Sequence, residues 1–186
     1  MKRIVLSAFI AVIVSGVARA EPKVILARTV VPTLVEDMRY ATTNNFLHAA
    51  VYVDTRCLLK PSVAAKLAIA VRILNERRPG FRLNVWDCYR PRAVQYKMWK
   101  VFPDARYVAD PKKGSRHNTG NAVDLTIVDG LGYEVEMPTE FDNFTRKAWP
   151  NAPTTPAAAG NRALLRDVMM KAGFKPIATE WWHFDG

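Results

Sequence analysis

Residues that hold metals and crosslinks are scarce in this sequence, which contains three histidines and two cysteines among its 186 residues. It has no internal repeat or low-complexity tract. Beyond the N-terminus it has no apolar run near the roughly 20 residues needed to cross a bilayer. Acidic residues are also few, 17 against 27 Lys and Arg. The lack of repeats and of long apolar runs excludes a repeat protein and a membrane-spanning mature chain. The shortage of acidic residues makes the protein basic.

The positive charge does not indicate a nucleic-acid partner. Basic residues are scattered along the chain, and the densest clusters are only the pairs Arg77-Arg78 and Lys112-Lys113. No nucleic-acid-binding motif accompanies them. A solvated basic surface, favourable near anionic envelope polymers, accounts for the charge. We therefore expect no nucleic-acid partner.

Residues 1–20 have the features of a secretory signal peptide. Lys2 and Arg3 precede an almost wholly apolar stretch over residues 4–14, and Ala18-Arg19-Ala20 is a small-x-small cleavage site. Removing this segment takes three basic residues and lowers the formal net charge from +10 to +7. We expect an exported, periplasmic protein whose residues 21–186 form one domain with a sizeable core.

The two cysteines, Cys57 and Cys88, are expected to form a disulfide. An even number of cysteines in an exported protein favours pairing, although two small buried side chains are the alternative. Cys88 is predicted to end a central strand and Cys57 to precede the helix packed on it. This placement allows contact and favours the disulfide.

The apolar pattern predicts a mixture of helices and strands. Three helices are predicted, over residues 61–78, 92–101 and 161–171. Four strands are predicted, over residues 82–88, 122–128, 133–137 and 178–184. Asn161 is the expected cap of the third helix, and residues 151–160 are expected to form an extended surface loop. This order predicts an α+β fold, a single domain with a mostly antiparallel central sheet flanked by helices.

Two of the three histidines lie beside candidate metal ligands. His117 is followed by Asp124, and His183 is preceded by Glu180. Two imidazoles and a carboxylate are typical protein ligands of a catalytic zinc, whose fourth position holds water, and the second carboxylate is a candidate base. Either histidine alone is better explained as a loop residue or as a core residue beside tryptophans. Spacing also leaves open which of Asp124 and Glu180 is the ligand.

The surrounding residues resemble a family. The chain is similar to the zinc peptidases that cut D-alanyl peptides of bacterial cell walls in two motifs, Ser115-x-His117-x-x-Gly120-x-Ala122-x-Asp124 and Glu180-x-Trp182-His183. It resembles the VanX-type D-alanyl-D-alanine dipeptidase branch in three further stretches, at residues 39–46, 87–91 and 141–144. One departure is Pro138, which stands where the family usually has glycine, so a changed pocket wall is expected there.

The resemblance implies a metal site and a base. It assigns one Zn²⁺ per chain to His117, Asp124 and His183, and it leaves Glu180 as the base that takes a proton from water. Glu180 and His183 are three residues apart, which would put them on opposite faces of a flat strand. A twist, a bulge or a strand end is therefore required between them.

The remaining site residues also follow from the resemblance. Arg90 is expected to stabilise the oxyanion, although a structural salt bridge to Asp87 is the alternative. Ser115, Asp142 and Tyr40 are expected to contact the substrate, with Asp142 suited to an ammonium and Ser115 to a carboxylate. Their alternatives are a turn cap, a loop anchor and a core side chain.

The expected activity is zinc-dependent hydrolysis of the dipeptide D-alanyl-D-alanine in bacterial cell-wall peptide metabolism. One alternative is a D,D-carboxypeptidase or endopeptidase that acts on longer peptidoglycan stem peptides. The other is a non-catalytic, zinc-bearing peptidoglycan-binding module. Binding alone requires neither Glu180 nor Arg90, so their presence favours an enzyme.

Overall fold

A five-stranded sheet with the order β2-β4-β5-β7-β6 forms the centre of the computed structural model, which describes residues 23–186. Its strands are β2 (Val35–Glu36), β4 (Arg82–Asp87), β5 (Ala122–Val128), β6 (Lys175–Pro176) and β7 (His183–Asp185). Every neighbouring pair is antiparallel except β2 with β4. A small second sheet pairs β1 (Ile25–Leu26) with β3 (Leu58–Leu59). The predicted signal peptide lies outside the described residues.

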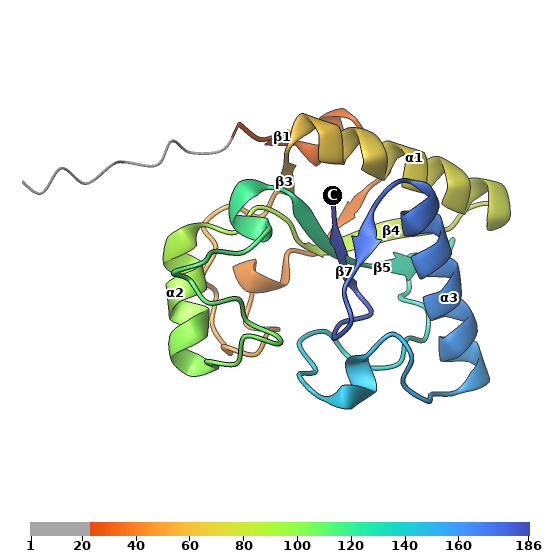
Figure 1. The fold of residues 1–186 in the computed structure, drawn as a ribbon. Helices are drawn as coiled ribbons and strands as arrows, with labels where there is room; N and C mark the ends of the chain where they lie inside the picture. The colour runs from red at the N-terminus through yellow and green to blue at the C-terminus, as the bar shows by residue number, and fades with distance from the viewer. Residues whose placement is uncertain (1–22) are drawn as a thin grey trace, which may run out of the picture.

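Three α-helices flank the sheet: α1 (Pro61–Arg77), α2 (Arg92–Val101) and α3 (Pro156–Lys171). Four short 3₁₀ helices complete the elements: η1 (Ala27–Thr29), η2 (Arg39–Ala41), η3 (His117–Thr119) and η4 (Arg146–Ala148). Figure 1 shows α1 and α3 next to each other on one side of the molecule and α2 on the opposite side. The predicted α+β fold is confirmed. Within residues 23–186, no helix is both long and apolar enough to cross a membrane.

The main core lies between the sheet and the helices α1 and α3. Helix α1 starts with Pro61, whose fixed φ suits the first helical turn, and it buries Leu67 and Leu74 completely. Strand β5 is buried at all seven of its positions, as expected for a strand covered on both faces. Helix α2 contributes Val94 and Met98 to a second, aromatic-rich cluster.

Cys57 and Cys88 form the expected disulfide. Both cysteines are fully buried, and the bond joins the residue before β3 to the residue after β4. It therefore links the small sheet to the end of a central strand.

The strand predicted over residues 133–137 is wrong. That segment makes only one isolated antiparallel bridge with β5, between Glu134 and Val128, next to a hydrogen bond from the Val135 amide to the Ile127 carbonyl. Pro138 then offers no N–H to continue a ladder. The predicted turn at Asp129-Gly130 is present, closed by a hydrogen bond from the Asp129 amide to the Tyr133 carbonyl.

The start of α3 and the last strand also differ from the predictions. Helix α3 begins at Pro156 rather than Asn161, because Thr155 is the cap and its hydroxyl accepts a hydrogen bond from the Ala158 amide. Residues 156–160 therefore belong to the helix and not to a surface loop. Strand β7 starts only at His183. The Trp181 amide donates to the Ala148 carbonyl, which lies outside the sheet, so the residues before His183 do not continue the strand.

Replacing the cap is expected to destabilise the protein measurably. Thr155→Ala removes the acceptor for the Ala158 amide and the bond that the Thr155 hydroxyl donates to Glu136 at 2.6 Å. We expect the free energy of unfolding to fall by about 1 kcal/mol, the usual loss of an N-cap. Urea denaturation measures it, with Thr154→Ala as the neighbouring control. Equal stability of Thr155→Ala and wild type would contradict this assignment of the cap.

Candidate active site

The sheet brings the three predicted metal ligands together. In the ladder of β5 with β7, Asp124 lies directly opposite His183. His117 starts η3, and Gly120 follows it with φ 64, a left-handed conformation that turns the chain into β5. The His183 Nδ1 atom lies 2.9 Å from Asp124 Oδ1 and 3.2 Å from His117 Nε2. The third side of the triangle, His117 Nε2 to Asp124 Oδ1, is 3.4 Å.

An outer hydrogen bond orients each imidazole. The Nδ1 atom of His117 lies 2.8 Å from the carbonyl oxygen of Cys88, and Nε2 of His183 lies 3.1 Å from Asp185 Oδ1. Both partners are acceptors, so these outer nitrogens carry the protons when the rings are neutral. The inner nitrogens can then present lone pairs to a metal ion that replaces the inner proton of His183, which lies next to Asp124. This is the arrangement in which proteins usually hold metal-binding histidines.

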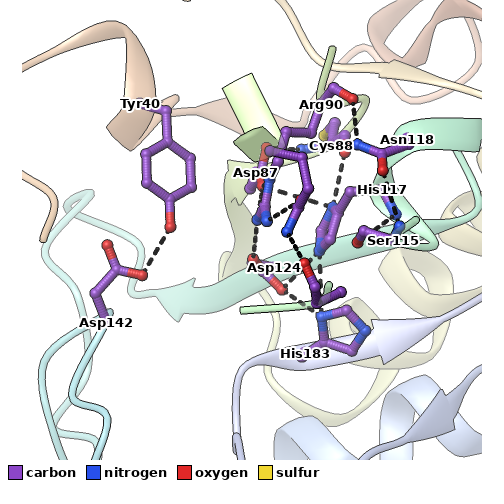
Figure 2. Close-up of polar contacts among 12 residues, drawn as sticks. Tyr40, Asp87, Cys88, Arg90, Ser115, His117, Asn118, Asp124, Asp142 and His183 are labelled. Carbon is purple, nitrogen blue, oxygen red and sulfur yellow. Dashed lines mark hydrogen bonds and ion pairs between the residues drawn. The ribbon is translucent and has the colours of Figure 1, made fainter. Parts of the chain in front are cut away.

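Three electron-pair donors this close together require a positive charge between them. His117, Asp124 and His183 are all buried, so water does not screen their repulsion. Burial lowers the pKa of His183, but the bonds to Asp124 and Asp185 outweigh it and raise this pKa to about 10. Burial likewise raises the pKa of Asp124, but the two histidines outweigh it and hold this pKa below its usual range. Two imidazoles and a carboxylate, converging as Figure 2 shows, fit a divalent cation.

Glu180 lies beside these donors without joining them. Its Oε2 atom is 3.9 Å from His183 Nδ1. Glu180 precedes β7 in an irregular segment, so the strand end that its spacing from His183 required is present. Burial raises the pKa of Glu180 to about 8, with a contribution from the negative charge of Asp124 against the opposing effect of His183. A raised pKa on a carboxyl next to a metal site is typical of a group that exchanges protons.

Arg90 forms the salt bridge to Asp87 and also lines the cavity, while its role toward an oxyanion stays a prediction. Its Nε and Nη2 atoms donate to Asp87 Oδ2 at 2.9 and 2.5 Å, and Nη1 donates to Gln95. The salt bridge of the alternative reading therefore exists. Arg90 also lines the cavity of the metal ligands, with Nη2 at 4.0 Å from Asp124 Oδ2. Three of its five N–H groups hold the guanidinium in place, which leaves two for a ligand.

One cavity, of about 220 Å³, is lined by every residue that the sequence analysis assigned to metal, catalysis or substrate. Away from the metal ligands, the Tyr40 hydroxyl donates to Asp142 Oδ1 at 2.8 Å, as Figure 2 shows, and the Phe46 amide donates to Oδ2 at 3.1 Å. Asp142 has φ 59, a left-handed conformation that aspartate tolerates better than most residues. Burial raises the pKa of Asp142 to about 7. Ser115 lies at the His117 turn, where its hydroxyl oxygen accepts the His117 amide.

Several residues that support the site were not identified from the sequence. Asp185 holds His183, and it follows that histidine by two positions in a strand, so the alternation of side chains could have found it. Gln95 holds Arg90 from the first turns of α2, and the Tyr52 hydroxyl donates to Asp87 at 2.6 Å. Tyr52 lies 35 residues from its partner, and no local pattern marks that contact.

Comparisons with known proteins agree with this geometry. Residues 20–186 match a peptidase family described as D-ala-D-ala dipeptidase. The D-alanyl-D-alanine dipeptidase of Escherichia coli is 37% identical over 155 residues, covering 83% of this chain and 79% of that protein. The D-alanyl-D-alanine dipeptidase of Streptomyces coelicolor is 31% identical over 170 residues, covering 80% and 83%. The corresponding protein of Enterococcus faecalis is 29% identical over the same length and coverage.

Removing one histidine of the cluster should remove the metal. We expect wild type, loaded and dialysed, to hold one divalent ion per chain, and His183→Ala to lose most of it because two donors remain. Metal analysis of the dialysed proteins measures this. His48→Ala is the matched control, since His48 is exposed and lies outside the cluster. Undiminished metal in His183→Ala would rule out this ligand set.

Proposed function

The chain belongs to the D-alanyl-D-alanine dipeptidase family of peptidases, and on that premise we propose that it is a zinc-dependent enzyme that hydrolyses free D-alanyl-D-alanine. The observation that carries the proposal is the chemistry of the cavity. Two histidines and a carboxylate converge at one end, and Asp142 lies away from them. A dipeptide with a free ammonium and a central carbonyl matches these two features.

The ammonium of the substrate binds at Asp142. Burial raises the pKa of the Tyr40 hydroxyl, so it stays protonated and keeps one carboxylate oxygen of Asp142 oriented. The pKa of Asp142, raised to about 7, falls when a cation arrives beside it, because the charged form is then stabilised. The Ser115 hydroxyl already accepts the His117 amide, so its own proton is free to donate to the substrate carboxylate.

His117, Asp124 and His183 would hold the zinc ion. Bound there, zinc would polarise a carbonyl and lower the pKa of water to about 7. The outer bonds of the two histidines, to Cys88 and Asp185, hold a proton on each outer nitrogen and orient the rings so that the inner nitrogens would face the ion.

Glu180 transfers the proton. Its carboxylate accepts a proton from the attacking water and donates one to the nitrogen of the leaving amine. The position of Glu180, 3.9 Å from the inner nitrogen of His183, keeps it beside the ligands without occupying a ligand position. A divalent ion nearby lowers its pKa from about 8, so the base form is available at neutral pH.

Arg90 stabilises the negative charge that develops on the carbonyl oxygen. Asp87 and Gln95 hold the guanidinium rigidly, so little reorganisation is needed when that charge appears. Tyr40 packs over the same guanidinium, with its ring centroid 5.2 Å from Arg90 Cζ. The two N–H groups not used by these partners are the ones that meet the substrate.

We also propose that the protein is exported to the periplasm and acts in cell-wall peptide metabolism. The signal-like residues 1–20 support export. The Cys57–Cys88 disulfide supports it independently, because disulfides persist in oxidising compartments.

The substrate assignment is tested by comparing two peptides. Zinc-loaded protein is incubated with free D-alanyl-D-alanine and, separately, with a pentapeptide stem that ends in D-alanyl-D-alanine, and released D-alanine is measured. We expect release from the dipeptide, because Asp142 requires an ammonium one residue before the scissile bond. Release from the stem alone would instead establish a D,D-carboxypeptidase. Stoichiometric zinc with release from neither peptide would favour a binding module.

The role of Glu180 is tested by removing its charge. We expect Glu180→Gln to keep zinc and fold but to lose about 10²–10⁴-fold in kcat, the usual contribution of general acid–base catalysis. KM should change little, because the metal and Asp142 remain. Glu140→Gln, at an exposed position, is the control for loss of one acid. A Glu180→Gln protein that arrives without zinc would show that Glu180 is a ligand.

A further inference from the structure

The acceptor that orients His117 is a backbone carbonyl. The Nδ1 atom of His117 donates to the carbonyl oxygen of Cys88, 29 residues away in sequence, at 2.8 Å. Metal-binding histidines are commonly held by such an acceptor, and its position decides how the ring points. Unlike a side-chain acceptor, a backbone carbonyl cannot rotate about side-chain bonds. Its position depends on what holds the backbone at Cys88.

The sheet does not hold Cys88 directly. Strand β4 ends at Asp87, and the last pair of its ladder with β5 is Asp87 with Asp124, after a register shift that follows Val85. The Cys88 amide bonds to the side chain of Asp87, at 2.9 Å. Two residues later, the Arg90 amide donates to the His117 carbonyl at 3.1 Å, and the Arg90 carbonyl accepts from Asn118 at 2.8 Å. Those bonds tie this stretch to the His117 turn itself, so an element outside the turn is needed to fix both.

That element is the segment that starts at Cys57. Its sulfur is bonded to that of Cys88, and the Leu58 carbonyl accepts the Tyr89 amide at 3.0 Å. Cys57 itself is anchored, since its carbonyl accepts the Ala27 amide at 2.8 Å. Apart from the 31 residues of chain between the two cysteines, the disulfide is thus the covalent link between this anchored segment and the carbonyl that orients His117.

The same segment also holds the other end of the His117 turn. The Lys60 amide donates to the carbonyl of Gly120 at 2.9 Å. The approach is close, because a Cβ at Gly120 would lie 3.1 Å from the Lys60 nitrogen. Residues 57–60 therefore contact the acceptor of His117 on one side and the end of its turn on the other.

We propose that the Cys57–Cys88 disulfide is a positioning element of the metal site, which fixes the Cys88 carbonyl, thereby orients His117, and so sets the affinity for the metal ion. This inference rests on the proposed metal-dependent function. It gives the disulfide a role separate from general stabilisation, because the affected quantity is the metal affinity of the folded protein.

The first test is the variant Cys57→Ala/Cys88→Ala, which keeps the Cys88 carbonyl and removes only the link. Zinc affinity is measured by competition with a chromogenic chelator, at a temperature where circular dichroism shows a folded chain. We expect the affinity to fall by about 10–100-fold, as when an outer partner of a metal ligand is lost. Nitrogen NMR of the metal-free protein should also show a smaller fraction of His117 protonated on Nδ1.

Leu165→Ala is the control for lost stability. Leu165 is fully buried in the core on α3, so this change lowers stability while it leaves the disulfide and the Cys88 carbonyl in place. It should leave both the zinc affinity and the His117 tautomer unchanged. If Leu165→Ala weakens zinc binding as much as the double variant does, the effect is one of stability and the proposal fails.

A second measurement covers the case in which the double variant does not fold. A dithiol reductant supplies two electrons and two protons to the wild-type disulfide, giving two thiols and an oxidised, cyclic reductant. After its removal under anaerobic conditions, the reduced protein should bind zinc 10–100-fold more weakly, about the loss of one outer partner, and reoxidation should restore the affinity. Unchanged affinity in a folded, disulfide-free protein would overturn the inference. Absence of zinc binding by the oxidised wild type would instead overturn the proposed function.

Discussion

The pairing of β5 with β7 is the constraint on which the site depends. Asp124 lies opposite His183 in that ladder, so backbone hydrogen bonds bring these two side chains together before any ion arrives. Because side chains alternate across a strand, a slip of one residue would turn one of them to the opposite face. Strand β5 is buried at every position, which fixes its register through the packing of its apolar residues. The apolar core therefore sets the geometry of the polar site.

The carboxyl groups without a close arginine partner explain why the cavity suits cationic groups. Asp124, Asp142 and Glu180 line it. Its three arginines, Arg90, Arg106 and Arg116, are each paired with another acid, namely Asp87, Asp104 and Asp185. Burial is the main cause of the raised pKa values of Glu180 and Asp142, and the negative charge of Asp124 adds to both. A metal ion at one end and, in the proposed function, a substrate ammonium near Asp142 would each stabilise the charged carboxylates. One electrostatic feature would then favour both.

The kinds of residue present were a better guide to the candidate site than the apolar periodicity was to where helices and strands begin and end. The scarcity of histidine made His117 and His183 identifiable, and a family resemblance separated Asp124 from Glu180. The false strand at residues 133–137 had the right composition, but only the tertiary structure shows that one bridge forms there. Helix α3 starts early because Thr155 and Pro156 form a stronger start signal than Asn161. The contact of Tyr52 with Asp87 had no signal at all, since it depends on how distant segments pack.

The spacing of the ligands has a consequence for how the chain resists unravelling. His117 and His183 are 66 residues apart, whereas the disulfide joins residues 31 apart, and the two spans do not overlap. An ion shared by His117 and His183 would close the loop between them, just as the disulfide closes the loop between the two cysteines. Both links would reduce the conformational freedom of the unfolded chain. One half of the domain is then restrained covalently and the other by coordination. A chelator would open the histidine loop and leave the cysteine loop intact, whereas a reductant would open the cysteine loop and leave the histidine loop closed.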